Sequence, residues 1–362
     1  MKNKKRILFI TDTFGYGGAE KQLAFVAEGL FNRGYVVGIC NLNQGDRNEG
    51  KRHVCSGVEM FEQGIANDSK IKYLIFCFNV AREFKPDIIV GFKELANFCA
   101  VIVGKLIRVP SIISERADPY RAYSNAGLNT RLILWIINHA SRGVFQTEQA
   151  AQFYDKKLYK NRTIIPNPIF PSDNIPAINY SKLPRTVVSL GRIDNVQKRL
   201  DVMINAFAQF HLLYPDYHLK IYGNGPDEDL IRQWIAEKDL VGCVHLMGVS
   251  KKPMYDLSQE GIFLITSDFE GISNSLLEAM ACGLPVVSTD HTPGGARLLI
   301  NDLENGLLVP MGDVEAIFKA LCHYVEDPLL AEKCGKNATK VLERFSASNI
   351  LDMWEKCLEK TC

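Results

Sequence analysis

Residues 267–290, SDFEGISNSLLEAMACGLPVVSTD, decide the fold of this 362-residue chain. They follow an apolar run at 262–265, IFLI, which predicts a buried strand. Ser273 predicts the N-cap of a helix with apolar residues at helical spacing, and Gly283 and Pro285 predict its end. A second strand follows. This order predicts half of a parallel α/β layer, with a loop and a helix N-terminus at the edge where such sheets bind ligands.

Two glutamates mark this edge, Glu270 in the loop and Glu278 in the helix, with seven residues between them. The helix N-terminus offers unpaired N–H groups and the positive end of a dipole, which suit a phosphate. Carboxylates pair poorly with phosphate, so the natural partners of the two glutamates are hydroxyl groups. A ligand with both groups is a sugar nucleotide. The alternative is that both glutamates are solvated charges.

The pattern SD-x-EG-x-x-N-x-x-LEAMA-x-GLPVVSTD resembles the E-x7-E signature of retaining glycosyltransferases of the GT-B fold, family 4. The resemblance implies an α/β protein of two doubly wound, Rossmann-like domains that face each other across a cleft. It implies that Glu270 orients the hydroxyls of the donor sugar and that Glu278 holds the ribose. The implied donor-binding residues of the stretch also include Gly271, Ile272, Ser273, Asn274 and Ser275.

The N-terminal part begins with a predicted strand at 6–12 and a glycine turn that contains Gly17 and Gly18. A dinucleotide site would look similar, but the second strand, 35–40, ends in Asn41 rather than in an acidic residue that would hold a ribose. This disfavours a nicotinamide enzyme. The resemblance implies that the glycine turn lies across the cleft from the donor diphosphate and helps to define the acceptor side. We count both glycines among the donor-binding residues.

Helices predicted at 70–84 and 93–107 alternate with strands at 86–90 and 109–114, which predicts a parallel sheet with right-handed crossovers. The segment 114–120, SERADPY, ends the last of these strands. It resembles the SER-x-DP motif of family members that extend lipid-linked oligosaccharides. We therefore predict acceptor-side roles for three of its charged residues, with a capped turn as the alternative: Glu115, Arg116 and Asp118.

The apolar segment 131–139, RLILWIINH, predicts a buried helix. A surface helix that touches a membrane is the alternative, because the N-terminal half of the chain is basic. Residues 1–170 hold 24 Lys and Arg against 15 Asp and Glu, a net charge of +9 that leaves −8 for the remainder. This charge predicts an anionic partner. No nucleic-acid recognition motif accompanies it, so an anionic membrane face or a diphosphate-linked acceptor fits better.

The second domain opens at 186–207 with a strand, a loop and a helix that bring Arg192 and Lys198 within reach of one anion. This pair resembles the family's donor-diphosphate ligands, which offset charge on the leaving group in place of a metal. The acidic run at 227–229 is explained by its place in a first helical turn, so we expect no metal site and no cofactor. The resemblance places Gly248 near the nucleotide base.

The predicted boundaries are a first domain at 1–170, a linker at 171–184 and a nucleotide-sugar domain at 185–345, with a C-terminal helix at about 346–362 that returns to the first domain. Ten cysteines without a CxxC pair predict free thiols. No apolar run is long enough to span a membrane, which favours a cytoplasmic protein, peripheral on the inner face of a bacterial membrane.

The expected reaction is transfer, with retention, of a hexose or N-acetylhexosamine from a UDP-sugar. The expected acceptor is a saccharide or a polyprenyl-diphosphate-linked saccharide in bacterial surface polysaccharide synthesis. Two other functions stay open within this fold: a UDP-sugar 2-epimerase, which the E-x7-E pattern disfavours, and a non-catalytic subunit that binds sugar nucleotide in an assembly complex.

Overall fold

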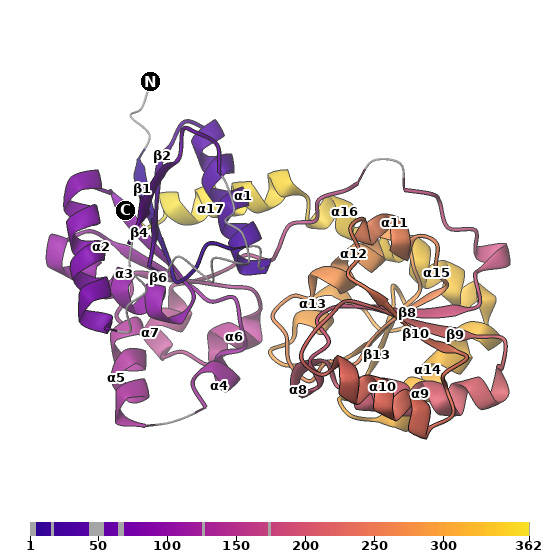
Figure 1. Ribbon diagram of the computed structural model, residues 1–362. Helices are drawn as coiled ribbons and strands as arrows, with labels where there is room; N and C mark the ends of the chain where they lie inside the picture. Colours follow the sequence, from indigo (N-terminus) through magenta and orange to yellow (C-terminus); the bar gives the residue numbers. More distant parts are fainter. Residues whose placement is uncertain are drawn as a thin grey trace. The chain divides into compact units, whose positions relative to one another are not determined.

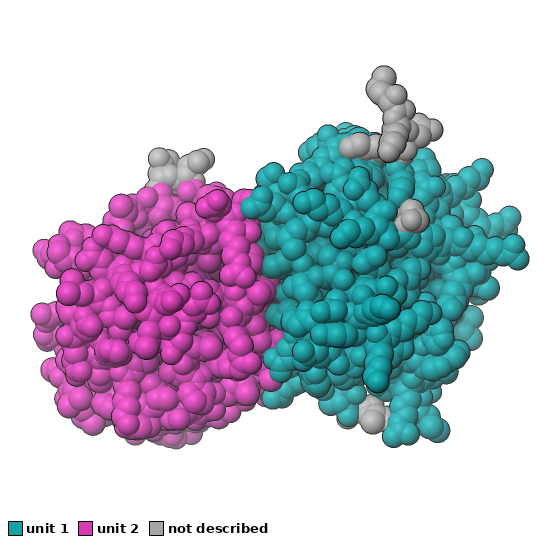
Figure 2. Space-filling model, turned by 180° about the vertical axis from the view of Figure 1, so that it is seen from behind, with its two compact units in different colours: residues 1–168, 347–362 teal, residues 169–346 magenta. Residues whose placement is uncertain are grey.

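The structure is a computed structural model that describes residues 5–15, 18–42, 54–63, 69–124, 127–172 and 175–361 (Figure 1). It divides into two compact units, coloured separately in Figure 2. Unit 1 comprises Met1–Pro168 and Ala347–Cys362, and unit 2 comprises Ile169–Ser346. Each unit is built on one parallel sheet.

Unit 1 has the strand order β3-β2-β1-β4-β5-β6-β7, all parallel. The order turns back on itself at β1 and β4, so right-handed crossovers put helices on both faces of the sheet. The strands are β1 (Arg6–Thr11), β2 (Val36–Asn41), β3 (Glu59–Glu62), β4 (Ile88–Phe92), β5 (Ser111–Ser114), β6 (Arg142–Phe145) and β7 (Arg162–Ile164). The helices are α1 (Gly18–Asn32), α2 (Lys70–Phe84), α3 (Glu94–Ile107), α4 (Pro119–Ala122), α5 (Leu128–Ile137), α6 (Glu148–Gln152), α7 (Lys156–Lys160) and α17 (Ala347–Glu359).

Unit 2 repeats this plan with the order β10-β9-β8-β11-β12-β13. Its strands are β8 (Thr186–Leu190), β9 (His218–Tyr222), β10 (Val244–Gly248), β11 (Ile262–Ile265), β12 (Val286–Thr289) and β13 (Leu307–Val309). Its α-helices are α8 (Asn195–Lys198), α9 (Leu200–Leu213), α10 (Glu228–Glu237), α11 (Pro253–Leu257), α12 (Asn274–Cys282), α13 (Gly295–Leu299), α14 (Val314–Glu326), α15 (Pro328–Ala338) and α16 (Val341–Arg344). The two doubly wound units confirm the predicted fold class.

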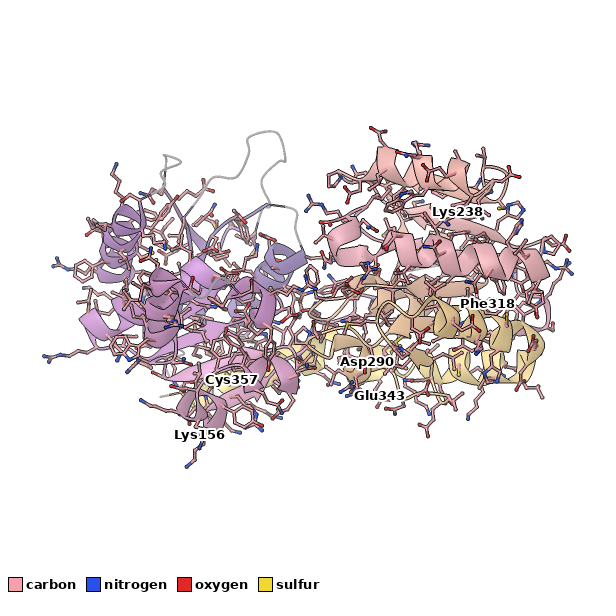
Figure 3. The ribbon with its side chains drawn as sticks, turned by 90° about the horizontal axis from the view of Figure 1, so that it is seen from below. Lys156, Lys238, Asp290, Phe318, Glu343 and Cys357 are labelled. Atoms are coloured by element: carbon pink, nitrogen blue, oxygen red, sulfur yellow. The ribbon has the colours of Figure 1, made fainter. Side chains whose placement is uncertain are left out.

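The chain crosses between the units twice. After the first crossing, a 3₁₀ turn, η1 (Tyr180–Lys182), packs on unit 2 because the Tyr180 hydroxyl donates to the Gly283 carbonyl at 2.7 Å. The stretch predicted as linker therefore belongs largely to unit 2. The second crossing leads into α17, where Trp354 is buried against Phe92 of unit 1 at a centroid distance of 6.1 Å. Cys357, labelled in Figure 3, lies on the same helix.

Helix α5 corrects the prediction of a buried helix over 131–139. Ile137 is buried in the core of unit 1, but Trp135 is 62% exposed and Leu132 is 55% exposed. The side of the helix that holds Ile137 packs against α3, whereas the apolar residues on its other side stay exposed. None of the described helices is both long enough and apolar enough to cross a membrane. The cysteines of the described part are free thiols, as predicted.

Candidate functional site

In unit 2, the predicted site residues gather at the point where the strand order reverses. β8 and β11 are neighbours in the sheet, and their connections leave toward opposite faces, which opens a crevice at their carboxyl ends. Arg192 follows β8, and Glu270 follows β11. A small pocket here is lined by Gly191, Arg192 and Lys198, among others.

Lys198 and Glu270 form an ion pair that the sequence did not predict. The Ser267 hydroxyl also donates to Glu270 Oε1, at 2.7 Å. Burial raises the pKa of the Glu270 carboxyl, but the charge of Lys198, helped by His291 and these hydrogen bonds, outweighs burial and leaves that pKa below its ordinary value. Glu270 is therefore held ionised, with a cation beside it, although it is only 9% exposed.

The loop that carries Glu270 is bound to α8 on one side. The Asp268 amide donates to the Gln197 carbonyl at 3.0 Å, and the Gln197 side chain donates to the Phe269 carbonyl at 3.1 Å. Arg199 Nη1 donates to Asp268 Oδ2 at 3.0 Å. Because α8 also supplies Lys198, these bonds fix the lysine and the glutamate relative to one another.

A second loop, after β12, supports Glu270 from the other side. The Glu270 amide donates to the Thr292 carbonyl at 2.8 Å. Gly295 lies so close that a Cβ there would come within 1.7 Å of the Gly271 carbonyl oxygen, so only glycine fits. Asp290, labelled in Figure 3, begins this loop and pairs with Arg297. His291 is 1% exposed, and neither of its ring nitrogens has a hydrogen-bond partner among the described residues.

Helix α12 begins as predicted. The Ser273 hydroxyl accepts from the Leu276 amide at 3.4 Å, and Gly283 ends the helix with φ of +85°. The predicted donor-binding residues of its first turn and of the loop before it differ in exposure: Ile272, Ser273 and Ser275 are buried, whereas Gly271 and Asn274 are half-buried. Glu278 is half-buried in the second turn of α12.

The remaining donor-site predictions fall in three places. Arg192 is exposed, and its side chain forms no hydrogen bond or ion pair with another described residue. Gly248 ends β10 with φ of +72°, at the same edge of the sheet of unit 2. Gly18 begins α1 in unit 1, and Gly17 lies outside the described residues.

Unit 1 has a pocket of about 510 Å³ at its own reversal point, between the ends of β1, β4 and β5. Asp12, Lys93 and Glu94 supply charge to its lining, and Phe98 and Tyr123 supply aromatic surface. Lys93 Nζ donates to Glu20 at 2.5 Å. The Lys93 backbone has φ of +80°, a conformation that costs a lysine free energy and that clusters at functional sites.

Glu115 and Arg116 line this pocket, and Asp118 does not. Glu115 is 1% exposed, and it accepts hydrogen bonds from the Tyr154 hydroxyl and from the amides of Arg116 and Ala117. Burial raises its pKa to about 7. Arg116 Nη1 donates to a backbone carbonyl, while its Nη2 is buried without a partner in the described structure. Asp118 caps α4 by accepting from the Tyr120 amide at 2.9 Å.

Sequence reasoning missed three residues of these sites. Asp12 ends the first predicted strand, and an acidic residue at the end of a parallel strand was a usable signal for a site. Burial raises the pKa of the Asp12 carboxyl to about 6. We found no sequence pattern that marks Lys93 or His291. Lys93 is distinguished by its backbone conformation and His291 by its burial, and both are known only from the structure.

Proteins similar to this chain include glycosyltransferases. Residues 173–341 match the family model of glycosyl transferases group 1. An uncharacterized glycosyltransferase of Methanocaldococcus jannaschii is 26% identical over 248 residues, which are 62% of this chain and 60% of that protein. An N-acetylgalactosaminyltransferase of Campylobacter jejuni, named for a diphospho-undecaprenol acceptor, is 37% identical over 154 residues, or 42% of this chain and 40% of that protein. The chain thus spans less than two thirds of either relative.

The crystal structure of Anabaena HepE in complex with UDP superposes with a TM-score of 0.80, at 19% identity, over 98% of this chain and 100% of HepE. At this identity the likeness concerns the fold. The chain has the GT-B fold, and slightly less than half of it, residues 173–341, matches the model of the glycosyl transferases group 1 family.

Proposed function

We propose that the chain transfers a hexose or N-acetylhexosamine from a UDP-sugar to a saccharide hydroxyl, with retention and without a metal ion. The observation that carries the proposal is the pair of cations at the reversal point of unit 2. Arg192 is exposed and unpaired within the described structure, and Lys198 is fixed beside the ionised Glu270. Two cations at a strand end and next to a helix N-terminus suit a diphosphate.

In the proposed reaction, Arg192 and Lys198 bind the donor diphosphate and stabilise the charge that develops on it as the sugar–phosphate bond breaks. Glu270 accepts hydrogen bonds from sugar hydroxyls, and Glu278 from the ribose. The acceptor oxygen bonds to the anomeric carbon on the face that the phosphate leaves, and its proton passes to the leaving phosphate oxygen. A carboxylate nucleophile is then unnecessary.

The names of related proteins support the donor and acceptor classes. HepE crystallises with UDP, and the Campylobacter relative is named for a lipid diphosphate acceptor. A Bacillus subtilis relative, 28% identical over 187 residues, is named as a poly(glycerol-phosphate) glucosyltransferase. We therefore propose a polyprenyl-diphosphate-linked acceptor in bacterial surface polysaccharide synthesis. The enzyme would then work at the inner, anionic face of the membrane.

The pocket of unit 1 is our candidate acceptor site. Asp12 and Glu94 offer carboxyl oxygens for sugar hydroxyls, and Phe98 and Tyr123 offer aromatic surface for the apolar face of a sugar ring. The mixture of acids, Lys93 and aromatic rings suits a neutral saccharide better than a nucleotide.

The test is a thermal-shift titration with UDP-, GDP- and ADP-sugars of the wild type and of Arg192→Ala, followed by NMR of the product anomer. A ligand that binds only the folded state raises Tm by mass action, so we expect UDP-sugars alone to do so, and less in the variant. Arg232→Ala removes an exposed arginine elsewhere in unit 2 and is the matched control. No shift with any sugar nucleotide would overturn the proposal. UDP-sugar binding without turnover on any acceptor would favour the non-catalytic subunit.

A further inference from the structure

We infer that the outer side of α5 is a docking surface for an anionic lipid bilayer. Three large apolar side chains lie there at helical spacing: Leu128, Leu132 and Trp135, with exposures of 85%, 55% and 62%. Arg131 lies on the same side, is exposed, and has no carboxylate partner in the described structure. Leucine, tryptophan and arginine together on one side of a surface helix are typical of an interfacial helix.

The charge around α5 identifies the partner. Residues 119–141 contain Arg121 and Arg131 and no Asp or Glu. Arg142, the next arginine, lies on β6 and is bonded to Thr361 and to the Lys360 carbonyl, so we do not count it. An apolar protein interface is depleted of charge at its centre, whereas an anionic bilayer attracts arginine through its headgroups and buries leucine and tryptophan below them. The combination therefore favours a lipid surface over a second protein.

The same helix connects this surface to the pocket of unit 1. Thr130 and Ile133 of α5 line the pocket, while Leu132 and Trp135, on its other side, are exposed. Lys70 of α2 also lines the pocket, and the next residue, Ile71, is 69% exposed. With α5 on the bilayer, the pocket would lie next to the membrane in which the lipid of the acceptor is anchored. This last step rests on the proposed function, and the docking surface itself does not.

The experiment measures sedimentation of the full chain with phosphatidylcholine vesicles, with and without phosphatidylglycerol. We expect binding only to the anionic vesicles, reduced about tenfold or more by Leu132→Glu because a buried apolar side chain becomes a charge in the interface. Leu212→Glu is the matched control, since Leu212 is 83% exposed on α9 of unit 2. Trp135 should shift its fluorescence to shorter wavelength on binding, and Trp135→Phe should abolish the shift while it keeps most of the binding.

The inference would be overturned by the absence of vesicle binding by the wild type, by equal binding to neutral vesicles, or by equal losses in Leu132→Glu and Leu212→Glu. A dimer that depends on Leu132, without vesicle binding, would assign the surface to a second copy and also overturn it. Turnover on a water-soluble acceptor separates the two proposals. Vesicle binding without any turnover contradicts only the proposed function, and turnover without vesicle binding contradicts only the docking surface.

Discussion

The two units share a strand order around their reversal points, yet the loops at those points carry different chemistry. In unit 2 the ends of β8 and β11 hold a lysine–glutamate pair and an exposed arginine. In unit 1 the ends of β1, β4 and β5 surround a pocket of about 510 Å³ lined by three acidic and three basic residues together with aromatic rings. The sheet thus decides where a ligand can bind, and the loops decide which ligand it is.

Two buried glutamates make the contrast concrete. Burial raises the pKa of both carboxyls, but Glu270 has Lys198 beside it and its pKa falls below the ordinary value. Glu115 has a neutral partner, the Tyr154 hydroxyl, and backbone amides, so its pKa is raised to about 7. A neighbouring cation, rather than burial, determines which glutamate is charged at neutral pH.

The largest effect should come from removing the cation of unit 2. Lys198→Ala should lower kcat by about 10²–10³-fold, as loss of one group that stabilises transition-state charge typically does. Initial rates of UDP release from a UDP-sugar measure this loss of kcat. Lys238→Ala is the control, because Lys238 is an exposed lysine elsewhere in unit 2. A loss of less than about tenfold would mean that the pair is structural.

The pH dependence of stability should separate the two glutamates. Glu115 has a folded pKa of about 7 against an ordinary 4.5, so its stabilising contribution is complete below about pH 4.5 and is lost as the pH rises through about 7. The loss should be on the order of 3 kcal/mol. Urea denaturation at pH 5 and pH 8 measures it, and Glu115→Gln should flatten the dependence. An unchanged slope in the variant would assign the effect to other groups.

The next effect tests the support of the Glu270 loop. Gly295→Ala should lower the free energy of unfolding by about 1–3 kcal/mol, because the new methyl group meets the Gly271 carbonyl and separates the two loops. UDP binding should weaken in parallel. Gly242→Ala is the control, since a Cβ there has no neighbour within 4 Å. Equal stability of the two variants would contradict the close contact.

The smallest expected change in stability is that of Arg192→Ala, within about 0.5 kcal/mol of the wild type, because the side chain is exposed and unpaired in the described structure. Its affinity for UDP should nevertheless fall by about tenfold. Calorimetric titration with UDP, next to a urea curve, gives both numbers. A large loss of stability would show that this arginine has a structural partner.

Much of the framework was predictable because its signals are local. The alternation of strands and helices, the Ser273 cap and the Gly283 stop depend on neighbours within a few residues, and the structure confirms them. Asp118 shows the limit of such reasoning. Its place after a strand suited a site residue and a helix cap equally, and the structure gives it the cap.

The sequence by itself determined the α/β class, the two doubly wound units and the edges of the sheets that carry the candidate sites, since periodicity and capping are properties of short segments. Only the tertiary structure decided what those edges contain. Lys198 and Glu270 are 72 residues apart in the chain and meet because β8 and β11 are neighbours. The exposure of Trp135 likewise depends on whether another element covers α5, and in the described part of unit 1 none covers its outer side. Burial and pairing between distant segments are collective properties of packing, which a local pattern does not encode.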